Sequence, residues 1–416
     1  MVYVFQSSFW MGLAQAFTIA ATFAVGVATT HCIKIEKLGD YKLVFAMGAM
    51  IGAFSMTGMS VAVTRAAARG EDGALASGFW SNLLWSFPAL LVGVPVAAYF
   101  GNKGNWDVVW GLAVAVPGIL ILQSTELAGA FLTGKKNFKL HARFAGLQSG
   151  LSSGLLAATL LVTRNIVLLT AVFYASNILI ALPIYAWVVR KCRREGTSPD
   201  GKAAVNYGKH LSAMNLLGTI SFQLDKVLAW QFLGPIPTAI YSFAIAPPQN
   251  LRVLGKNLSA ISLPKLAEKE PAELKRLVPR KAVVVLVLSI ALIAAYVAGA
   301  PYIFRWFFPP KYMECVPYSR WYSLVILGFP LVLFQNSLIA HQETRAQYVI
   351  NTTLPVFKTI LYFVLIPKFQ VSGIVASILI TEILHFVLVL WFFSQMKTPA
   401  KSEPLPEIIP ATEASL

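Results

Sequence analysis

Charged residues are scarce in this chain. Only 12% of its 416 residues are Asp, Glu, Lys or Arg, about half of what a soluble domain carries, and 57% are hydrophobic. Acidic residues are scarcer than basic ones, with 18 Asp and Glu against 34 Lys and Arg, so the formal net charge is +16. A soluble protein with this balance would suggest nucleic acid as a partner. Because the basic residues here lie between long apolar runs, we expect them to orient a membrane protein, and we expect no nucleic-acid partner.

Cysteines and the usual signatures of enzymes are also scarce. The three cysteines are Cys32, Cys192 and Cys315; none has a partner at metal-site spacing, and we expect no disulfide. The sequence shows no His-rich metal spacing, nucleophile elbow or phosphate loop, so we expect neither an enzyme nor a bound metal or cofactor. The first apolar run lacks a basic leader and a small-residue cleavage site, so we expect a retained helix.

Long apolar runs make up most of the chain. A membrane-spanning helix needs about 20 mostly apolar residues. We predict an all-α integral membrane fold of about twelve transmembrane helices, with no linker long enough for a soluble domain. The predicted spans are residues 8–30, 43–64, 77–100, 108–132, 144–163, 166–189, 210–233, 237–261, 282–304, 321–341, 346–366 and 371–393.

The distribution of basic residues and a weak internal repeat predict the organisation of these spans. Most of the 34 Lys and Arg residues fall in the segments that lie inside if both termini are cytoplasmic. Leu-Gly follows both the first and the seventh predicted helix, at Leu38 and Leu233, which indicates two similar halves in parallel orientation. We expect an N-terminal six-helix lobe (1–189), a cytoplasmic linker (190–209), a C-terminal six-helix lobe (210–393) and a disordered cytoplasmic tail (394–416).

The stretch from Thr219 to Glu268 carries the most unusual pattern. It reads as two apolar helices joined by a Gly-Pro hairpin at Gly234, with charges inside the spans and a Pro247-Pro248 pair that we expect to interrupt the second helix. Charge at membrane depth is costly and is usually kept for function or paired. A helix that ends in mid-membrane is tolerated only where neighbouring protein or a water-filled cavity satisfies its backbone. The stretch therefore predicts a polar path across the membrane.

Arg252 and Lys256 are the first candidate ligands for an anion. They are four residues apart and share one helix face, with Asn250 and Asn257 on a neighbouring stripe. Such a face suits a pyrophosphate or a sugar, because Arg offers a planar fork and Lys a point charge to phosphate oxygens. The alternative is an amphipathic helix end whose cations reach anionic lipid headgroups.

Asp225 is the acid in the middle of the seventh predicted helix. We expect it to balance a cavity cation or to bind a proton or sodium ion that couples transport. A local pair with Lys226 is the alternative, although consecutive helical residues point about 100° apart, which makes a direct pair poor geometry.

Other charged residues inside the predicted spans are further candidates. Glu126 and Lys358 could each line the same polar path. Glu382 and His385 are three residues apart and could simply satisfy each other. Arg65 ends the second predicted helix, where it could serve a cytoplasmic gate or anchor that end of the helix equally well.

Several short motifs together resemble one transporter family. The motifs are the Leu38-Gly39-Asp40-Tyr41 turn, the Thr64-Arg65-Ala66 helix end, Asp225 followed by Leu233-Gly234 and Tyr241-Ser242-Phe243-Ala244, the Leu263-Pro264-Lys265-Leu266 helix end and the turn from Pro367 to Ser377. The chain resembles the O-antigen repeat-unit flippases, in the polysaccharide-transporter branch of the multidrug/oligosaccharidyl-lipid/polysaccharide (MOP) superfamily.

The resemblance implies a function and its setting. It implies two lobes around a central cavity, and translocation of undecaprenyl-pyrophosphate-linked repeat units across the bacterial inner membrane for surface polysaccharides such as lipopolysaccharide O-antigen. Its implied partners are the lipid-linked oligosaccharide, membrane lipids, a polymerase and other polysaccharide-assembly proteins. We expect Arg252, Lys256 and Lys358 to bind the pyrophosphate.

Two other functions remain open at this point. The first is a cation-coupled multidrug antiporter of the same superfamily, which would rely on acids lining the cavity; the first predicted helix offers only Gln15 and Thr18 as sizeable polar groups. The second is a membrane-bound glycosyltransferase or polymerase. That function needs catalytic acids in a large outer loop, and the longest predicted outer loop, 305–320, holds only Glu314.

Overall fold

The computed structural model describes residues 2–194, 201–267, 269–341 and 343–396, which form helices and no strand. The N-terminal half holds α1 (Val2–Cys32), α2 (Ile35–Gly52), α3 (Met59–Ala68), α4 (Ala74–Leu84), α5 (Phe87–Asn102), α6 (Trp106–Thr125), α7 (Leu127–Gly134), α8 (Phe138–Val162) and α9 (Ile166–Arg194). The C-terminal half holds α10 (Lys202–Leu233), α11 (Pro235–Ala267), α12 (Pro271–Phe307), η1 (Pro310–Glu314), α13 (Cys315–Ser323), η2 (Leu324–Gly328), α14 (Leu331–Ala340) and α15 (Thr344–Gln395).

All of the predicted spans lie on helices, but several are interrupted. The span 43–64 passes from α2 to α3 through residues 53–58, and the span 108–132 passes from α6 to α7 at Glu126. Within α15 the backbone of Gln370 is not helical (φ 53°), so the helix is kinked between the spans 346–366 and 371–393. In the described part of the chain, seven stretches are long and apolar enough to cross a membrane: Ala74–Asn102, Trp106–Gly134, Phe138–Val162, Ile166–Cys192, Pro271–Phe307, Pro310–Ala340 and Arg345–Gln395.

The Gly-Pro hairpin is confirmed, but the predicted break at Pro247-Pro248 is wrong. Gly234 ends α10 with a positive φ of 88°, which glycine adopts without strain, and Pro235 opens α11 where no amide hydrogen bond is needed. α11 then continues through both prolines to Ala267. Proline's fixed φ is itself helical, and a membrane helix tolerates the lost hydrogen bonds where neighbouring helices pack against it.

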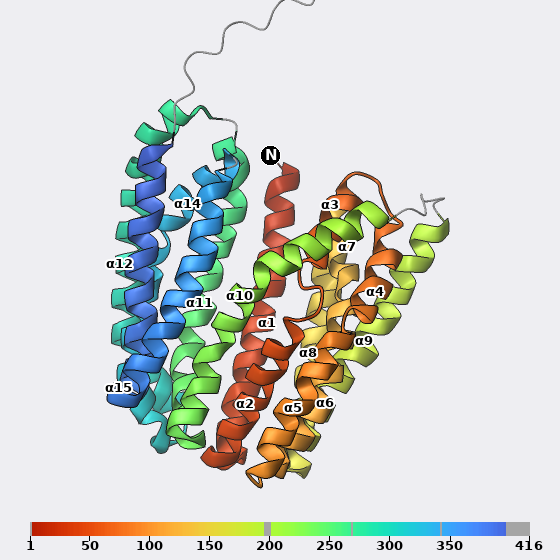
Figure 1. Ribbon diagram of the computed structural model, residues 1–416, viewed down its shortest axis with the longest axis vertical. Coiled ribbons are helices and arrows are strands. Elements are labelled where there is room, and N and C mark those ends of the chain that lie inside the picture. The colour runs from red at the N-terminus through yellow and green to blue at the C-terminus, as the bar shows by residue number, and fades with distance from the viewer. Residues whose placement is uncertain (1, 195–200, 268, 342, 397–416) are drawn as a thin grey trace, which may run out of the picture.

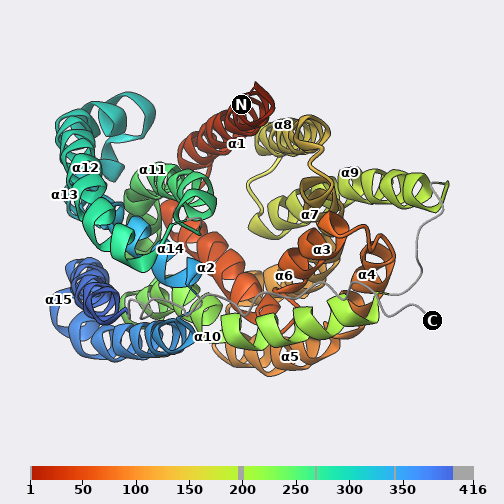
Figure 2. The ribbon, with the colours of Figure 1, turned by 90° about the horizontal axis from the view of Figure 1, so that it is seen from above.

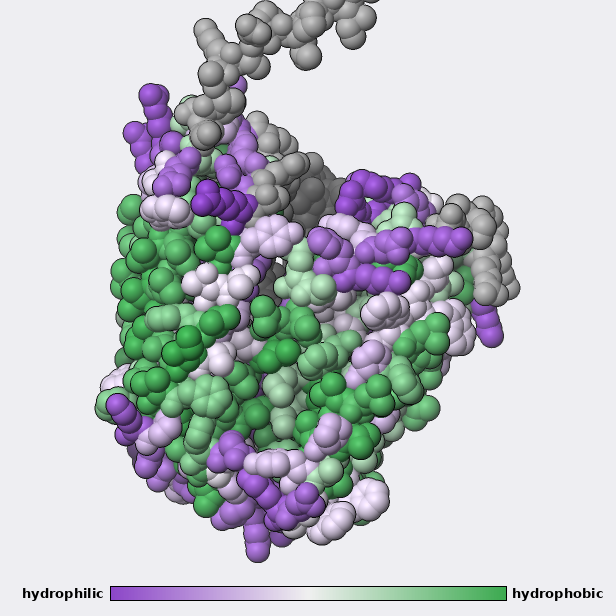
Figure 3. Space-filling view, in the orientation of Figure 1, coloured by the Kyte–Doolittle hydropathy of each residue, from purple (hydrophilic) through white to green (hydrophobic). Residues whose placement is uncertain are grey.

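The surface has the polarity of a membrane protein. Figure 3 shows a broad hydrophobic belt between two hydrophilic ends. Many large apolar side chains of the described residues are exposed, among them Leu84 (73%), Leu161 (86%) and Trp306 (75%). A water-soluble protein rarely leaves so continuous an apolar surface uncovered, so the belt marks a region that faces lipid.

The two halves of the chain lie side by side and meet along α2, α10 and α11. Seen from above, α12, α13 and α15 lie on one side, α6, α7 and α9 on the other, and α2 between them (Figure 2). At the lower end of Figure 1, where α10 turns into α11, Gly39 of α2 lies against Pro235; a Cβ on Gly39 would overlap the Pro235 carbonyl oxygen. The Leu-Gly motif therefore permits a close contact between the halves.

The halves also meet near the upper end of Figure 1, through the first part of α10. The Gly58 amide donates a hydrogen bond to Ser212 Oγ (2.9 Å), which ties the turn between α2 and α3 to α10. A Cβ on Gly58 would crowd Leu211 and Ser212. The contacts at Gly39 and Gly58 thus hold α2 and the turn after it against the start of α11 and against α10.

The predicted boundaries differ from the helix ends. α9 continues to Arg194 and α10 begins at Lys202, so both ends of the predicted linker are helical. Residues 195–200 and the predicted tail from residue 397 onward lie outside the described residues. Cys32 and Cys315 are not joined in a disulfide.

Candidate functional site

Helix α10 separates two cavities of different size. The larger one, which we call the N-half cavity, has a volume of about 780 Å³ and lies between α1, α2, α6, α8 and α9 on one side and α10 on the other. The smaller one, the C-half pocket, has a volume of about 190 Å³ and lies between α10, α11, α13 and α15. Asp225 lines the pocket, whereas the adjacent Lys226 lines the cavity. Because consecutive helical residues point about 100° apart, one helix serves as the wall between them.

The N-half cavity has a polar lining within an aromatic frame. Glu126 is the one carboxylate among the described residues that line it, against two ammonium groups, those of Lys42 and Lys226. Its side-chain amides and hydroxyls belong to Gln123, Gln148, Asn177, Gln223, Thr18, Thr22, Thr29, Ser149, Ser152 and Ser153. Its aromatic residues are Tyr41, Phe45, Phe173 and Tyr174. Cavities of this size and character are typical of sites for small-molecule ligands or headgroups.

Lys42 and Lys226 approach the cavity from the two halves of the chain. The Lys42 ammonium lies 4.6 Å from the centre of the Phe243 ring and makes no ion pair with a described residue. The Lys226 ammonium lies 3.6 Å from Asp225 Oδ1 and donates a hydrogen bond to Gln223 Oε1 (3.3 Å). The two ammonium groups repel each other. An anion placed between them would relieve this repulsion.

The contact between Lys226 and Asp225 corrects the expectation that their geometry is poor. The Lys226 side chain is long enough to bend back toward its neighbour, and the Lys226 backbone amide also donates a hydrogen bond to Asp225 Oδ1 (2.8 Å). On its other side, Asp225 Oδ2 accepts a hydrogen bond from the hydroxyl of the fully buried Tyr241 (2.6 Å). Asp225 and Lys226 therefore form an ion pair, and Tyr241 is a second partner of the Asp225 carboxylate.

The C-half pocket gathers most of the charged residues that the sequence predicted inside the spans. Asp225, Arg252, Lys358, Glu382 and His385 all line it. Arg252 Nη2 donates to Glu382 Oε1 at 2.7 Å, and His385 Nδ1 lies 3.4 Å from Glu382 Oε2. The predicted pairing of Glu382 with His385 is thus present, but Arg252 shares that carboxylate. Two carboxylates, those of Asp225 and Glu382, thus share this pocket with the cations of Arg252 and Lys358.

Glu126 occupies a separate position in the N-terminal half. It is the residue between α6 and α7, and it lines both the N-half cavity and a neighbouring chamber of about 370 Å³. His141 lines that chamber as well, packed against Gly129, where a Cβ would crowd its ring. Among the residues described, no group of three His, Cys, Asp or Glu side chains is placed to hold a metal ion.

The remaining predicted residues lie away from both cavities or outside the described side chains. The Arg65 guanidinium stacks 4.7 Å from the centre of the Tyr207 ring, which links α3 to α10. Asn250 is half-buried on α11 and lines neither cavity. Lys256 and Asn257 are in α11, but their side chains lie outside the described residues.

Most of the residues that line the N-half cavity were not predicted from the sequence. Lys42 was assigned to an outer segment, because the predicted span began one residue later, at 43. The polar residues on α8 and α9 are short or uncharged and give no signal by composition. A possible signal was the spacing of Gln148 and Ser152, which are four apart on one helix face.

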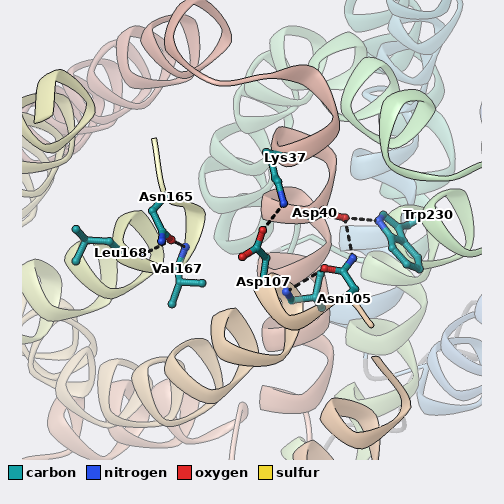
Figure 4. Close-up of polar contacts among 9 residues, drawn as sticks. Lys37, Asp40, Asn105, Asp107, Asn165, Val167, Leu168 and Trp230 are labelled. Carbon is teal, nitrogen blue, oxygen red and sulfur yellow. Dashed lines mark hydrogen bonds and ion pairs between the residues drawn. The ribbon is translucent and has the colours of Figure 1, made fainter. Parts of the chain in front are cut away.

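A second polar cluster ties the halves together at the lower end of Figure 1. Asp40 of α2 accepts hydrogen bonds from the Trp230 indole of α10 (2.8 Å) and from Asn105 (3.4 Å), as Figure 4 shows. Lys37 pairs with Asp107 in the same cluster, and the hydrogen bond that the Lys37 ammonium donates to the Asp107 carboxylate raises the pKa of Lys37 above its usual value. These contacts join α2, α6 and α10.

Comparisons with known proteins agree with this arrangement. The sequence matches the family described as polysaccharide biosynthesis protein over residues 4–254. Among curated proteins, no sequence matches the chain significantly.

Several solved structures have a similar fold. The lipid II flippase MurJ in an inward closed conformation is 14% identical, with a TM-score of 0.70 over 94% of this chain and 87% of that one. A MOP superfamily transporter from Pyrococcus furiosus is 13% identical, with a TM-score of 0.63 over 94% and 95% of the two chains. An outward-facing multidrug resistance MATE family transporter is 15% identical, with a TM-score of 0.60 over 95% and 97%. At these identities the similarity shows a shared fold.

Proposed function

Because the chain belongs to the polysaccharide biosynthesis protein family, which it matches over residues 4–254, we propose that it is a flippase for oligosaccharides linked to an isoprenoid pyrophosphate. Its fold is that of the MOP superfamily transporters. The finer parts of the proposal follow the family resemblance: undecaprenyl as the lipid, O-antigen or similar repeat units as the cargo, and the bacterial inner membrane as the location.

The proposal includes a membrane orientation. We place about twelve crossings in two six-helix lobes, with both termini and the upper end of Figure 1 on the cytoplasmic side, because the predicted basic segments gather there. The lower end, with the Gly234 turn and the Asp40 cluster, then faces outward. In this orientation Arg65 and its stacking on Tyr207 belong to a cytoplasmic gate.

The observation that carries the proposal is the N-half cavity. It has room for a headgroup, and it presents Lys42 from α2 and Lys226 from α10. Two ammonium groups that repel each other in the empty cavity suit a pyrophosphate, whose charge they would share. The amides and hydroxyls of α1, α8 and α9 suit sugar hydroxyls, and aromatic residues such as Phe45 and Tyr174 suit their apolar faces.

The predicted pyrophosphate ligands Arg252 and Lys358 fit a different role. Their pocket, about 190 Å³, is smaller than the N-half cavity, about 780 Å³, and Arg252 is already paired with Glu382. We propose that Arg252, Lys358 and Asp225 balance charge beside the cavity. Glu126, the one carboxylate that lines the cavity in the described residues, remains our candidate for ion coupling.

The test is complementation of a bacterium that lacks its own repeat-unit flippase. We expect the full-length chain to restore surface polymer and to drain the cytoplasm-facing pool of lipid-linked repeat units. Lys42→Met and Lys226→Met should each reduce this flux about tenfold, since each removes one charged hydrogen-bond donor to phosphate. Lys103→Met is the matched control, because Lys103 is exposed over Tyr99 and lines neither cavity.

Two results would overturn parts of the proposal. Equal flux in Lys42→Met, Lys226→Met and Lys103→Met at equal expression would remove the two lysines as pyrophosphate ligands. A pool that stays high with several repeat-unit types supplied, together with drug efflux from the same cells, would replace the flippase with a multidrug antiporter.

A further inference from the structure

A further role in transport follows from the positions of Asp225, Lys226 and Lys358. This role rests on the proposed function and extends it. Lys226 belongs to the cavity, Lys358 belongs to the pocket, and Asp225 lies between them in the wall. One buried carboxylate therefore faces two ammonium groups that are on different sides of α10.

In the structure the carboxylate pairs on the cavity side. Lys226 Nζ lies 3.6 Å from Asp225 Oδ1, while Lys358 is in direct contact with no carboxylate in the described part of the chain. Pairing with Asp225 lowers the effective charge that Lys226 presents to Lys42. Asp225 thus takes the place of an anion while the cavity is empty.

In the loaded protein a pyrophosphate would compete for Lys226. Removing Lys226 from Asp225 would normally leave a buried carboxylate uncompensated, which is costly. Lys358 offers an alternative, because it lines the same pocket as Asp225 and carries the opposite charge, while the like charges of Lys226 and Arg252 repel it. When the ligand draws Lys226 away, that repulsion weakens and the attraction of Asp225 remains. Glu382 is less available, because it is held by Arg252 and His385.

We propose that Asp225 is a built-in counter-ion that exchanges partners during transport, pairing with Lys226 when the cavity is empty and with Lys358 when a pyrophosphate occupies it. The hydrogen bond from Tyr241 (2.6 Å) keeps the carboxylate in the wall in both states. Lys358 is then a positioning residue, which affects ligand binding through Asp225 without touching the ligand.

The proposal gives a specific pattern of binding to farnesyl pyrophosphate, measured by titration calorimetry on the full-length protein in detergent. Lys358→Met should weaken binding on the order of tenfold, since the bound state leaves the Asp225 carboxylate without a cation to pair with. Asp225→Asn should bind at least as tightly as the wild type, because Lys226 no longer has a competing carboxylate. The double variant Asp225→Asn with Lys358→Met should match Asp225→Asn alone. Lys368→Met, an exposed lysine on the same helix, is the control.

The outcomes separate this inference from the proposed function. If the wild type does not bind farnesyl pyrophosphate, or if Lys42→Met and Lys226→Met leave binding unchanged, the proposed site fails. If those two variants weaken binding but Lys358→Met does not, the exchange of partners is refuted. It is refuted as well if Lys358→Met weakens binding equally with Asp225 or Asn at position 225, because Lys358 would then act on the anion directly or on the fold.

Discussion

The N-half cavity and the C-half pocket lie on two sides of one helix and differ in how their charges are balanced. In the pocket, Arg252 is 2.7 Å from Glu382, and cations and carboxylates are equal in number. In the cavity, Lys42 has an aromatic ring but no described carboxylate as a partner. A charge that the protein neutralises serves its own structure, whereas a charge left without a partner is available to a ligand.

This difference sets the kind of effect that a substitution should have on each side. In the pocket, removing one charge leaves its partner buried and alone, so the fold should lose stability. In the cavity, removing Lys42, which has no ion-pair partner among the described residues, removes a repulsion, so the fold should keep its stability while ligand binding is lost. Each prediction below would break or sharpen this contrast.

The largest effect on stability is expected for Arg252→Met. It leaves the Glu382 carboxylate with His385 alone, and we expect a loss of about 2 kcal/mol, reduced from the usual cost of breaking a buried pair because Arg252 is partly exposed. Thermal unfolding in detergent measures the loss. The double variant Arg252→Met with Glu382→Leu should recover most of it, and Lys42→Met should show no loss. Equal losses in Arg252→Met and Lys42→Met would contradict the contrast.

A large effect on transport, without loss of binding, is expected for Asp225→Asn. When residue 225 has no carboxylate, nothing relieves the repulsion between Lys42 and Lys226 in a cavity without ligand. The return of the unloaded carrier should therefore slow. In proteoliposomes with a fluorescent isoprenyl-pyrophosphate sugar, we expect net transport to fall about tenfold. Exchange against unlabelled substrate on the opposite side should continue, because only the loaded carrier moves in that assay. A parallel fall in net transport and exchange would argue against the counter-ion.

How far the sequence predicted the fold depends on which features are local. The apolar runs placed the helices, and the Gly234-Pro235 turn follows from the backbone preferences of those two residues. Pro247 and Pro248 were misread because a local rule predicts a break, whereas packing against neighbouring helices keeps α11 continuous. The break at residues 53–58 was missed for the converse reason: no proline stands there, and its Gly58 contact with Ser212 lies far away in the sequence.

The site was predicted as a set of charges but not as two cavities. Charge at membrane depth identified Asp225, Arg252, Lys358 and Glu382, and the structure brings them into one pocket. The same rule overlooked Lys42, which falls at a predicted span boundary, and it has no means of finding uncharged residues such as Gln148. Which side of α10 a residue faces depends on tertiary packing, and a helix pattern alone does not contain that information.

The smallest predicted effect concerns Gln148, which separates sugar binding from pyrophosphate binding. Gln148 Nε2 donates a hydrogen bond to Asn177 Oδ1 (3.2 Å), and both residues line the cavity on the α8 and α9 wall, across from α10, which carries Lys226. Gln148→Leu removes the donor at similar volume, so binding of a sugar-bearing isoprenyl pyrophosphate should weaken by about 1 kcal/mol, roughly fivefold. Binding of farnesyl pyrophosphate, which has no sugar, should not change in the same calorimetric titration. If both ligands weaken equally, Gln148 shapes the cavity as a whole, and the division into a lysine end for phosphate and an amide wall for sugar is incorrect.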